Sequence, residues 1–334
     1  MHYVRLIAFI IAVAWSSLHA SPEFYEGIAS AQFFESSQGH MLRYTRFETS
    51  VKEKKGDVVF IQGRGTFLEF YEVLIDPLLD RGYDVWMYDL TGQGASSRLA
   101  IGKETTELTA QRMQHIDSFE KYVFDVQDFV QRVVIPEVNR GTLLLGGYST
   151  GAHIAFRYLQ VYPRHPFQGM FAISPLVSLK IPVPHNLFLG TLNGMALVKD
   201  MRSYVKAGDV DPIYEMAFST NPYTSEAERF QEMQRLCLEN TPWMMGGVSW
   251  SWLRAATESV LALWEEEALQ SIQIPVLIST AGEDGVVDVS YNEQFAQSLP
   301  TSKNICYPKG RHELFRETNS IREDWWQEFD AYFK

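Results

Sequence analysis

Cysteine is scarce in this chain of 334 residues, which contains only Cys237 and Cys306. A disulfide framework is therefore excluded, and the chain, 46% of it hydrophobic, is long enough to bury a large core instead. In an oxidising compartment the two thiols could pair, but the sequence does not tell whether their Cα atoms approach each other. We expect two buried free thiols, neither of them catalytic.

Clusters of positive charge are lacking too. The formal net charge is −12 and no run of lysine and arginine occurs, which argues against a nucleic-acid partner because phosphates attract basic patches. The H-E-x-x-H spacing that is typical of a zinc site does not occur in the sequence. The segment 89–94 lacks the third glycine of a dinucleotide fingerprint, so we exclude a nicotinamide site. We expect no metal, no cofactor and no protein partner.

No apolar run is long enough to span a bilayer. Residues 6–15 are all apolar, Arg5 precedes them, and residues 16–20 form a short exit. Ten apolar residues are typical of a signal peptide, here residues 1–20, with cleavage after Ala20. We expect an exported protein, periplasmic or secreted, that begins at Ser21; an uncleaved membrane anchor is the alternative.

Strand-like and helix-like patterns alternate along most of the chain. Short apolar runs at 57–61, 83–88, 142–145, 168–173, 275–280 and 304–307 predict strands. Amphipathic stretches at 67–79, 119–134, 152–160, 291–298 and 321–333 predict helices. This alternation predicts an α/β fold, a mainly parallel sheet with helices on both faces.

The alternation stops at Pro175 and resumes near Gln273. Between them lie aromatic residues and methionines in helical patterns, without a strand-like run. We predict a helical cap at 175–273, inserted into a core made of residues 21–174 and 274–334.

Gly147-Tyr148-Ser149-Thr150-Gly151 follows the predicted strand at 142–145 and opens a helix. G-x-S-x-G alone is a weak signal, but this context is the one that a nucleophile elbow requires. We therefore predict Ser149 as a nucleophile, with the backbone N–H of Thr150 in the oxyanion hole. An ordinary strand-to-helix turn is the alternative.

A nucleophilic serine needs a histidine base and a carboxylate that orients the base. Asp284 lies on the turn after the strand 275–280, with Glu283 and Asp288 as rivals. His312, in a loop after the strand 304–307, is the only histidine beyond Asp284. We predict that Ser149, Asp284 and His312 form a catalytic triad.

The second oxyanion donor is expected from the turn after the strand 57–61. Gly63 allows the backbone to approach closely, and the N–H of Arg64 is then the donor. A plain glycine-rich turn is the alternative.

Several stretches together resemble the lysophospholipase and monoacylglycerol lipase branch of the α/β-hydrolases, which is similar to serine aminopeptidase S33-type hydrolases. They are residues 62–64 (QGR), 89–96 (DLTGQGAS), the Ser149 elbow, 283–288 (EDGVVD) and 312–317 (HELFRE), with 221–225 (NPYTS) and 250–253 (WSWL) in the cap. The resemblance runs from about Glu35 to the C-terminus. Gln62 departs from it, since a histidine or proline is usual there.

The resemblance implies a serine hydrolase that cleaves the ester of a single-chain lipid, a lysophospholipid or a monoacylglycerol, through an acyl-enzyme. An acyltransferase or small-ester esterase with the same triad, or a non-catalytic lipid-binding protein on a hydrolase scaffold, are the alternatives. Apolar cap residues are expected to hold the acyl chain, among them Phe188, Leu192 and Trp252. A transient contact with a membrane surface is also expected.

Overall fold

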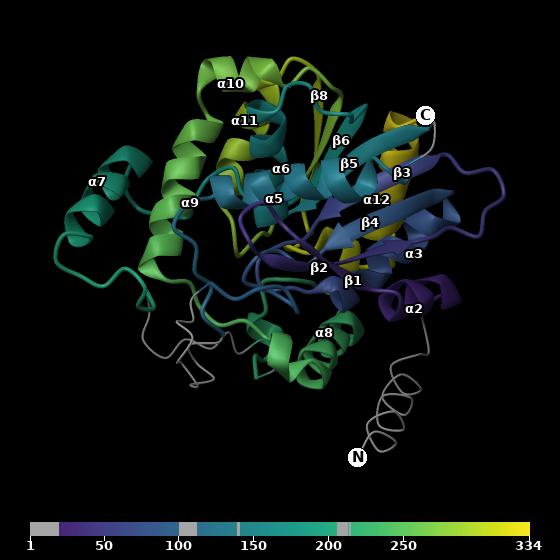
Figure 1. Ribbon diagram of the computed structural model, residues 1–334, viewed down its shortest axis with the longest axis horizontal. Coiled ribbons are helices and arrows are strands. Elements are labelled where there is room, and N and C mark those ends of the chain that lie inside the picture. The colour runs from purple at the N-terminus through teal and green to yellow at the C-terminus, as the bar shows by residue number, and fades with distance from the viewer. Residues whose placement is uncertain (1–19, 100–111, 139–140, 206–212, 214) are drawn as a thin grey trace.

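The computed structural model describes residues 20–99, 112–138, 141–205, 213 and 215–334 (Figure 1). Within them, eight strands form one sheet in the order β1-β2-β4-β3-β5-β6-β7-β8. β1 and β2 pair antiparallel to each other and β2 antiparallel to β4, and the remaining pairs are parallel. The strands are β1 Gln32–Glu35, β2 Met41–Phe47, β3 Gly56–Ile61, β4 Tyr83–Tyr88, β5 Thr142–Tyr148, β6 Gly169–Ile173, β7 Val276–Ala281 and β8 Ser302–Tyr307.

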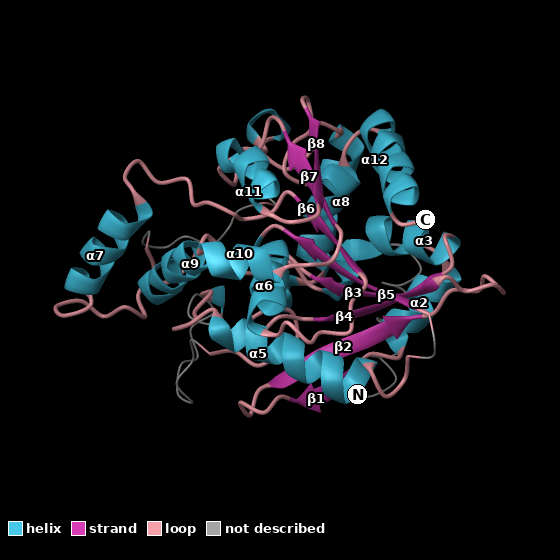
Figure 2. Cartoon of the chain, turned by 90° about the horizontal axis from the view of Figure 1, so that it is seen from above, coloured by secondary structure: helices cyan, strands magenta, loops and turns pink. Residues whose placement is uncertain are grey.

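Helices cover both faces of this sheet (Figure 2). The described α-helices are α2 Pro22–Ala29, α3 Glu72–Asp80, α5 Glu120–Phe129, α6 Thr150–Val161, α7 His185–Met195, α8 Ala227–Glu239, α9 Trp250–Leu263, α10 Glu266–Ser271, α11 Asn292–Ser298 and α12 Asn319–Tyr332. Apolar residues of α5, α6, α9 and α11 share one core cluster, and those of α3, α8 and α12 share the other. The predicted α/β fold, with a mainly parallel sheet, is confirmed.

The central strands are buried on both faces because helices cover both. In β3, Val59 contributes to the cluster with α5 and α6, while Val58 and Phe60 point to the cluster with α3 and α12. Period-two alternation sends successive side chains to opposite faces, so a strand in the middle of the sheet is apolar throughout. This is the pattern from which the sequence analysis predicted residues 57–61 as a strand.

The antiparallel pair β1 and β2 was not predicted. β2 carries Arg43 and Arg46, which hide its strand pattern in the sequence. Arg43 Nε lies 2.7 Å from Asp89 Oδ2, and Arg46 Nη2 lies 2.6 Å from Asp84 Oδ2. The partners come from β4 and the turn after it, so only the folded chain shows why these charges are tolerated.

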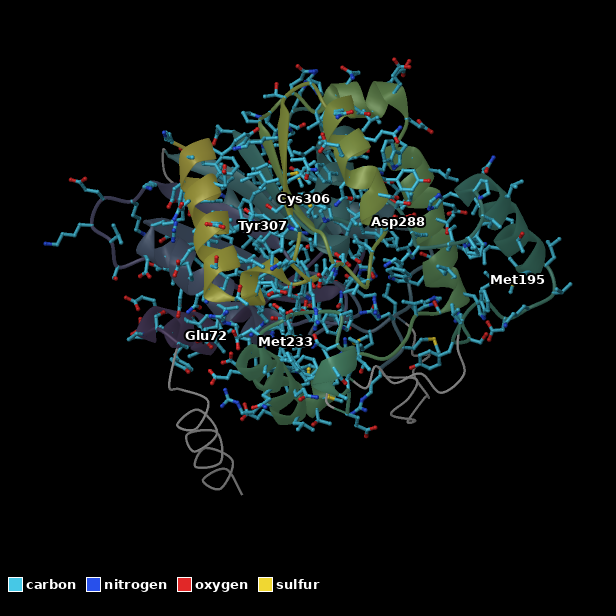
Figure 3. All side chains as sticks on the ribbon, turned by 180° about the vertical axis from the view of Figure 1, so that it is seen from behind. Glu72, Met195, Met233, Asp288, Cys306 and Tyr307 are labelled. Atoms are coloured by element: carbon cyan, nitrogen blue, oxygen red, sulfur yellow. The ribbon has the colours of Figure 1, made fainter. Side chains whose placement is uncertain are left out.

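The insertion between β6 and β7 carries α7, α8, α9 and α10. α9 packs against α6, and Trp252 belongs to the core cluster of that face. α7 packs on α9 and stands away from the sheet (Figure 1). α8 lies apart from both helices, near the lower edge of this view. In the view from behind, Met195 marks the outer end of α7 and Met233 marks α8, far apart (Figure 3). No described helix combines the length and apolarity needed to cross a membrane.

Candidate active site

Ser149 occupies a strained turn between β5 and α6. Its backbone has φ 53° and ψ −119°, a conformation that costs a non-glycine residue about 1–3 kcal/mol. The Ser149 N–H donates to Ile173 O at 2.9 Å, and Ser149 O accepts from Leu176 N at 3.1 Å. A Cβ on Gly151 would lie 2.2 Å from Ile61 O, so only glycine lets α6 begin this close to β3. The turn therefore holds the serine at the carboxyl end of the sheet.

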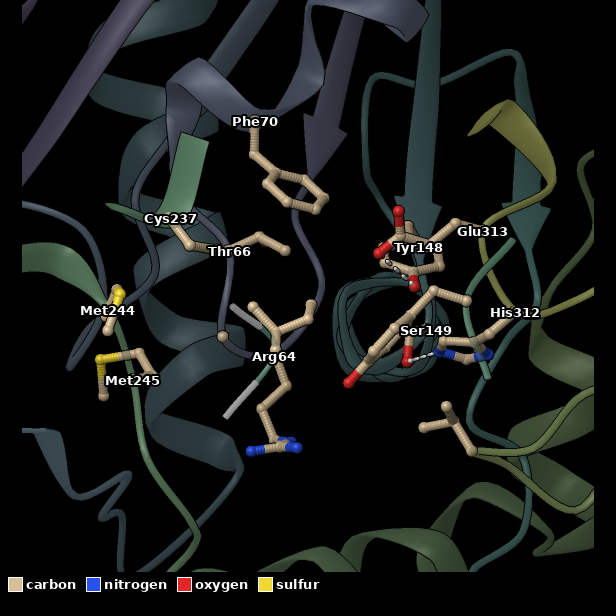
Figure 4. Close-up of a pocket in the computed structure, with 14 residues that line it drawn as sticks. Arg64, Thr66, Phe70, Tyr148, Ser149, Cys237, Met244, Met245, His312 and Glu313 are labelled. Atoms are coloured by element: carbon tan, nitrogen blue, oxygen red, sulfur yellow. Dashed lines mark hydrogen bonds between the residues drawn. The ribbon is translucent and has the colours of Figure 1, made fainter. Parts of the chain in front are cut away.

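The structure brings the three predicted side chains together. His312 Nε2 lies 2.9 Å from Ser149 Oγ, and His312 Nδ1 lies 2.6 Å from Asp284 Oδ2. Asp284 Oδ1 accepts from the N–H groups of Val286 and Val287, which leaves Oδ2 to the imidazole. His312 and Asp284 are both buried. Figure 4 shows Ser149 directed at the imidazole ring.

The rival carboxylates have other surroundings. Glu283 is exposed, and Asp288 accepts from the N–H of Ser290 at 3.1 Å and from its hydroxyl at 2.6 Å. Asp288 thereby caps the 3₁₀ turn Val289–Tyr291 and supports the loop. Among the three carboxylates, Asp284 is the one that contacts the histidine.

The turn after β3 is fixed by hydrogen bonds from its neighbours. The Gly63 N–H donates to the Tyr71 hydroxyl at 2.7 Å, and the Gly65 N–H donates to Gln93 Oε1. The Gln62 amide donates to Thr66 O at 3.1 Å, so this departure from the family pattern braces the turn from within. Arg64 lines a cavity with Ser149 and Thr150. The use of the Arg64 and Thr150 N–H groups as oxyanion donors stays a prediction.

The loop that carries His312 is bonded to part of the cap, residues 221–239, which we call the α8 segment. The His312 N–H donates to Pro222 O at 3.2 Å, and the Glu313 N–H donates to Tyr223 O at 2.8 Å. The Thr224 hydroxyl donates to Arg316 O at 2.7 Å. Backbone and side-chain bonds thus fix the position of the histidine from the cap side.

Glu317 is the centre of this network. It is fully buried, and its carboxylate accepts from the N–H groups of Ser225, Arg311 and Thr318 at 2.9, 2.9 and 3.1 Å, and from the Ser225 hydroxyl. The sequence analysis did not single out Glu317. Its place in the matching stretch 312–317 was the available signal, but the partner Ser225 lies 92 residues away.

Glu313 is a second buried carboxylate, next to His312. Its Oε1 accepts from the Tyr148 hydroxyl at 3.4 Å, and its Oε2 lies 3.4 Å from Arg316 Nε. Burial raises the pKa of Glu313 to about 7, although the charge of Arg316 opposes this shift. Glu313 is thus a titrating group within the active-site wall.

Two cavities meet at Ser149. The residues that line the smaller one, about 60 Å³, include Thr66, Tyr148, His312 and Glu313 and the sulfur-containing Cys237, Met244 and Met245 (Figure 4). The larger one has a volume of about 410 Å³. Besides Arg64, Ser149, Thr150 and Gly247, its walls are apolar side chains: Leu176, Leu179, Val205, Val248, Trp252, Val286 and Val287.

The three predicted acyl-chain residues differ in position. Trp252 lines the larger cavity. Phe188 and Leu192 lie on α7 and border neither cavity at Ser149; Leu192 is fully buried where α7 packs on α9. The expectation of two buried thiols was wrong for Cys306, which is exposed on the edge strand β8. Cys237 and Cys306 form no disulfide, and Cys237 is buried at the wall of the smaller cavity.

This arrangement has the parts of nucleophilic catalysis. A hydroxyl contacts an imidazole nitrogen, and the other imidazole nitrogen contacts a buried carboxylate, the order in which serine hydrolases activate a serine. His153, by contrast, is buried between Leu176 O and the Ser259 hydroxyl, where burial lowers its pKa to about 3. These hydrogen bonds give His153 a structural role.

Comparison with known proteins agrees with this geometry. A family model described as serine aminopeptidase, S33, matches residues 52–319. The chain is 25% identical over 270 residues to a probable lysophospholipase L2 of Haemophilus influenzae, covering 80% of each protein. It is 26% identical over 295 residues to lysophospholipase L2 of Escherichia coli K12, covering 84% of this chain and 80% of the relative.

A similar solved structure is a soluble variant of monoglyceride lipase from Saccharomyces cerevisiae in complex with a substrate analogue. The TM-score is 0.67 at 18% identity, over 91% of this chain and 94% of that one. At this identity the likeness supports the fold alone.

Proposed function

This chain belongs to the serine aminopeptidase S33 family of α/β-hydrolases and is a carboxylic ester hydrolase; from that premise we propose that it cleaves the ester of a single-chain lipid, a lysophospholipid first and a monoacylglycerol second. The observation that carries this proposal is the apolar cavity of about 410 Å³ that opens at Ser149, whose hydroxyl is hydrogen-bonded to His312. The names of the curated relatives support a lipid substrate.

In the first step Ser149 Oγ attacks the ester carbonyl carbon while His312 Nε2 takes the hydroxyl proton. Asp284 stabilises the imidazolium, and the N–H groups of Thr150 and Arg64 hold the negative oxygen of the tetrahedral intermediate. The bond from that carbon to the leaving oxygen then breaks, and His312 gives its proton to the leaving alcohol. Water attacks the acyl-enzyme by the same route and releases the fatty acid.

The acyl chain occupies the larger cavity. Its apolar walls remove the chain from water, and each buried CH₂ contributes about 0.8 kcal/mol. The volume is at the lower end of the roughly 300–1,000 Å³ found for ligand pockets, which favours one chain over two. The smaller cavity, with Glu313 and Tyr148 in its wall, accommodates polar atoms next to the ester.

The lipid reaches the site from a membrane surface that the α7 segment, residues 181–198, contacts. This segment contains no Asp, Glu, Lys or Arg in a chain of net charge −12. Leu187, Leu197 and Val198 are 63%, 86% and 89% exposed. Apolar side chains on a projecting element are typical of a transient contact with lipid.

The test is a substrate series with matched active-site variants. We expect release of fatty acid from lysophosphatidylcholine and monoacylglycerol to exceed turnover of butyryl nitrophenyl ester in kcat/KM. Ser149→Ala is expected to lower all three by a factor on the order of 10⁶, since triad members act as a unit. More than about a tenth of the activity in this variant would contradict the assignment.

The acid of the triad is tested by a matched pair. Asp284→Asn removes the charge that orients His312 and is expected to lower kcat by a factor on the order of 10⁴. Glu283→Gln changes the adjacent exposed carboxylate and is expected to leave kcat within about twofold. The reverse order would move the acid to Glu283.

A further inference from the structure

Ser21 is the N-cap of α2, the first helix among the described residues. The Ser21 hydroxyl accepts from the Phe24 N–H at 3.1 Å and so caps α2, and Pro22 occupies the first helical turn. Phe24 stacks on Phe47 of β2, with ring centroids 5.2 Å apart and an interplanar angle of 7°. The Gly27 carbonyl accepts from the Thr45 hydroxyl. α2 thus packs on the core, and Ser21 caps its N-terminus.

Asp76 of α3 holds that first residue by both of its polar groups. The Ser21 N–H donates to Asp76 Oδ2 at 2.8 Å, and the Ser21 hydroxyl donates to Asp76 Oδ1 at 2.6 Å. Both oxygens of the Asp76 carboxylate therefore accept hydrogen bonds from the same residue, which lies 55 positions earlier in the chain. The contact joins the start of α2 to α3.

The charge at Asp76 has no described counter-charge. Among the described residues, no printed ion pair joins Asp76 to a lysine, arginine or histidine, and the negative charges of Asp80 and Glu23 both act on it. Burial and these two acidic neighbours raise the pKa of Asp76, and the hydrogen bonds from Ser21 oppose this shift. A half-buried carboxylate beside two further acids favours a cation at this point.

We propose that the Ala20–Ser21 peptide bond is hydrolysed during maturation and that the new ammonium group of Ser21 becomes the counter-ion of Asp76. A signal peptidase adds water across the bond, so that Ala20 leaves with a carboxylate and Ser21 keeps the amine. An α-amino group has a pKa of roughly 7.7–8.0 and is protonated at neutral pH. The nitrogen that becomes charged is the one already 2.8 Å from Asp76 Oδ2, and charge-assisted hydrogen bonds are about twice as strong as neutral ones.

Two features of the sequence favour cleavage at this bond. The apolar run 6–15 ends five residues before Ala20, and the small residue Ala20 precedes the bond. Ala20 and Ser21 are both partly exposed. Cleavage at this bond removes no residue of α2 and converts its N-cap, Ser21, from a neutral residue into an ion-paired one.

The first experiment identifies the N-terminus. The full chain is expressed in a bacterium with its export machinery, and the folded protein is analysed by intact mass and N-terminal sequencing. We expect Ser21 as the first residue. An intact Met1, or a start at another residue, would overturn the proposal.

The second experiment isolates the ion pair in a double-mutant cycle. Two proteins, one starting at Ser21 and one at Ala20, have the same net charge, but in the second the ammonium lies one residue farther from Asp76. Asp76→Asn is expected to lower the melting temperature of the Ser21 protein by about 2 °C more than that of the Ala20 protein. Acetylating the amine of the Ser21 protein is expected to remove this difference.

Asp80→Asn is the matched control, because Asp80 is an exposed carboxylate one turn away on α3. It is expected to shift both proteins equally. Equal losses with Asp76→Asn, or the same difference with Asp80→Asn, would overturn the ion pair. Neither experiment uses ester hydrolysis, so the outcome is independent of the proposed function.

Discussion

Two segments of the inserted cap differ in how they are attached to the catalytic core. The α8 segment is bonded to the His312 loop through backbone groups at Pro222 and Tyr223 and through the buried carboxylate of Glu317. The α7 segment packs mainly on α9 and leaves Leu187, Leu197 and Val198 exposed. One segment of the cap therefore holds the loop that carries His312, and the other presents apolar surface to the surroundings.

This difference separates two requirements of a lipid hydrolase. The histidine must stay within hydrogen-bond distance of Ser149, which demands a rigid support with satisfied polar groups. Access to a lipid at a membrane needs exposed apolar side chains, which contribute little to the folded core. If separate segments of one insertion perform these tasks, as we propose, each can be changed without the other, and this independence can be tested.

The largest effect in this comparison is expected from Glu317→Gln. The variant loses the charge that four donors share and leaves at least one buried N–H group poorly bonded, which costs about 3 kcal/mol. Because Glu317 holds the loop that carries His312, we expect this loss to displace the imidazole. The kcat is then expected to fall about a hundredfold on every substrate, with KM little changed. The exposed Glu323→Gln on α12 is the control. A change in kcat below twofold, with the fold intact, would disconnect the α8 segment from catalysis.

The next effect is expected on the α7 segment. The double variant Leu187→Ser and Leu197→Ser is expected to lower hydrolysis of lysophospholipid in vesicles about tenfold, because it removes apolar area that enters the membrane surface. Turnover of a soluble butyryl ester is expected to change less than twofold. Leu238→Ser, an exposed leucine on α8, is the matched control and is expected to leave vesicle activity unaltered. Equal losses on vesicles and soluble ester would assign the α7 segment a structural role.

A smaller, selective effect locates the acyl chain. Leu179→Ala enlarges the cavity at Ser149 and is expected to lower kcat/KM for long-chain esters about tenfold more than for butyryl esters. Phe188→Ala, which borders neither cavity, is expected to show less chain-length dependence. If Phe188 shows the larger dependence, the acyl chain runs along α7 instead.

The smallest effect concerns pH, through Glu313 of the rigidly held loop. Its pKa is raised to about 7 in the folded protein, so the folded state holds this proton to a higher pH than the unfolded chain. The stability that the protonated Glu313 contributes to the folded state is fully present below about pH 4.5 and is lost as the pH rises through 7. Urea unfolding from pH 5 to 8 is expected to show a loss on the order of 2 kcal/mol that Glu313→Gln lacks. The same slope in both proteins would contradict the shift.

The sequence was sufficient for the parts of the fold that repeat a simple pattern. Buried parallel strands are continuous apolar runs, and both β3 and β4 were predicted within one residue. β2 was missed because its two arginines obtain partners only in the folded chain. An alternating apolar pattern in the sequence indicates which side chains are buried. It does not indicate a buried charge whose partner comes from another segment of the chain.

The candidate site likewise has residues that the sequence predicts and residues that it does not. Ser149, Asp284 and His312 stand at the ends of predictable strands, so chain order and turn position were enough to select them. Glu317 has no such marker, since acidic loop residues are usually solvated and its donors come from distant segments. For α7, helical apolar spacing did not distinguish Leu192, buried on α9, from Leu187, exposed to solvent.

The central claim, that Ser149 is the nucleophile of a lipid ester hydrolase, is tested most directly by covalent labelling. The folded protein is treated with a fluorophosphonate, and the modified residue is located by peptide mass spectrometry, with and without lysophosphatidylcholine as competitor. We expect a single label on Ser149, slower labelling in the presence of the lipid, and none in Ser149→Ala. A label on another residue, with Ser149 unmodified while ester hydrolysis is lost, would contradict the account.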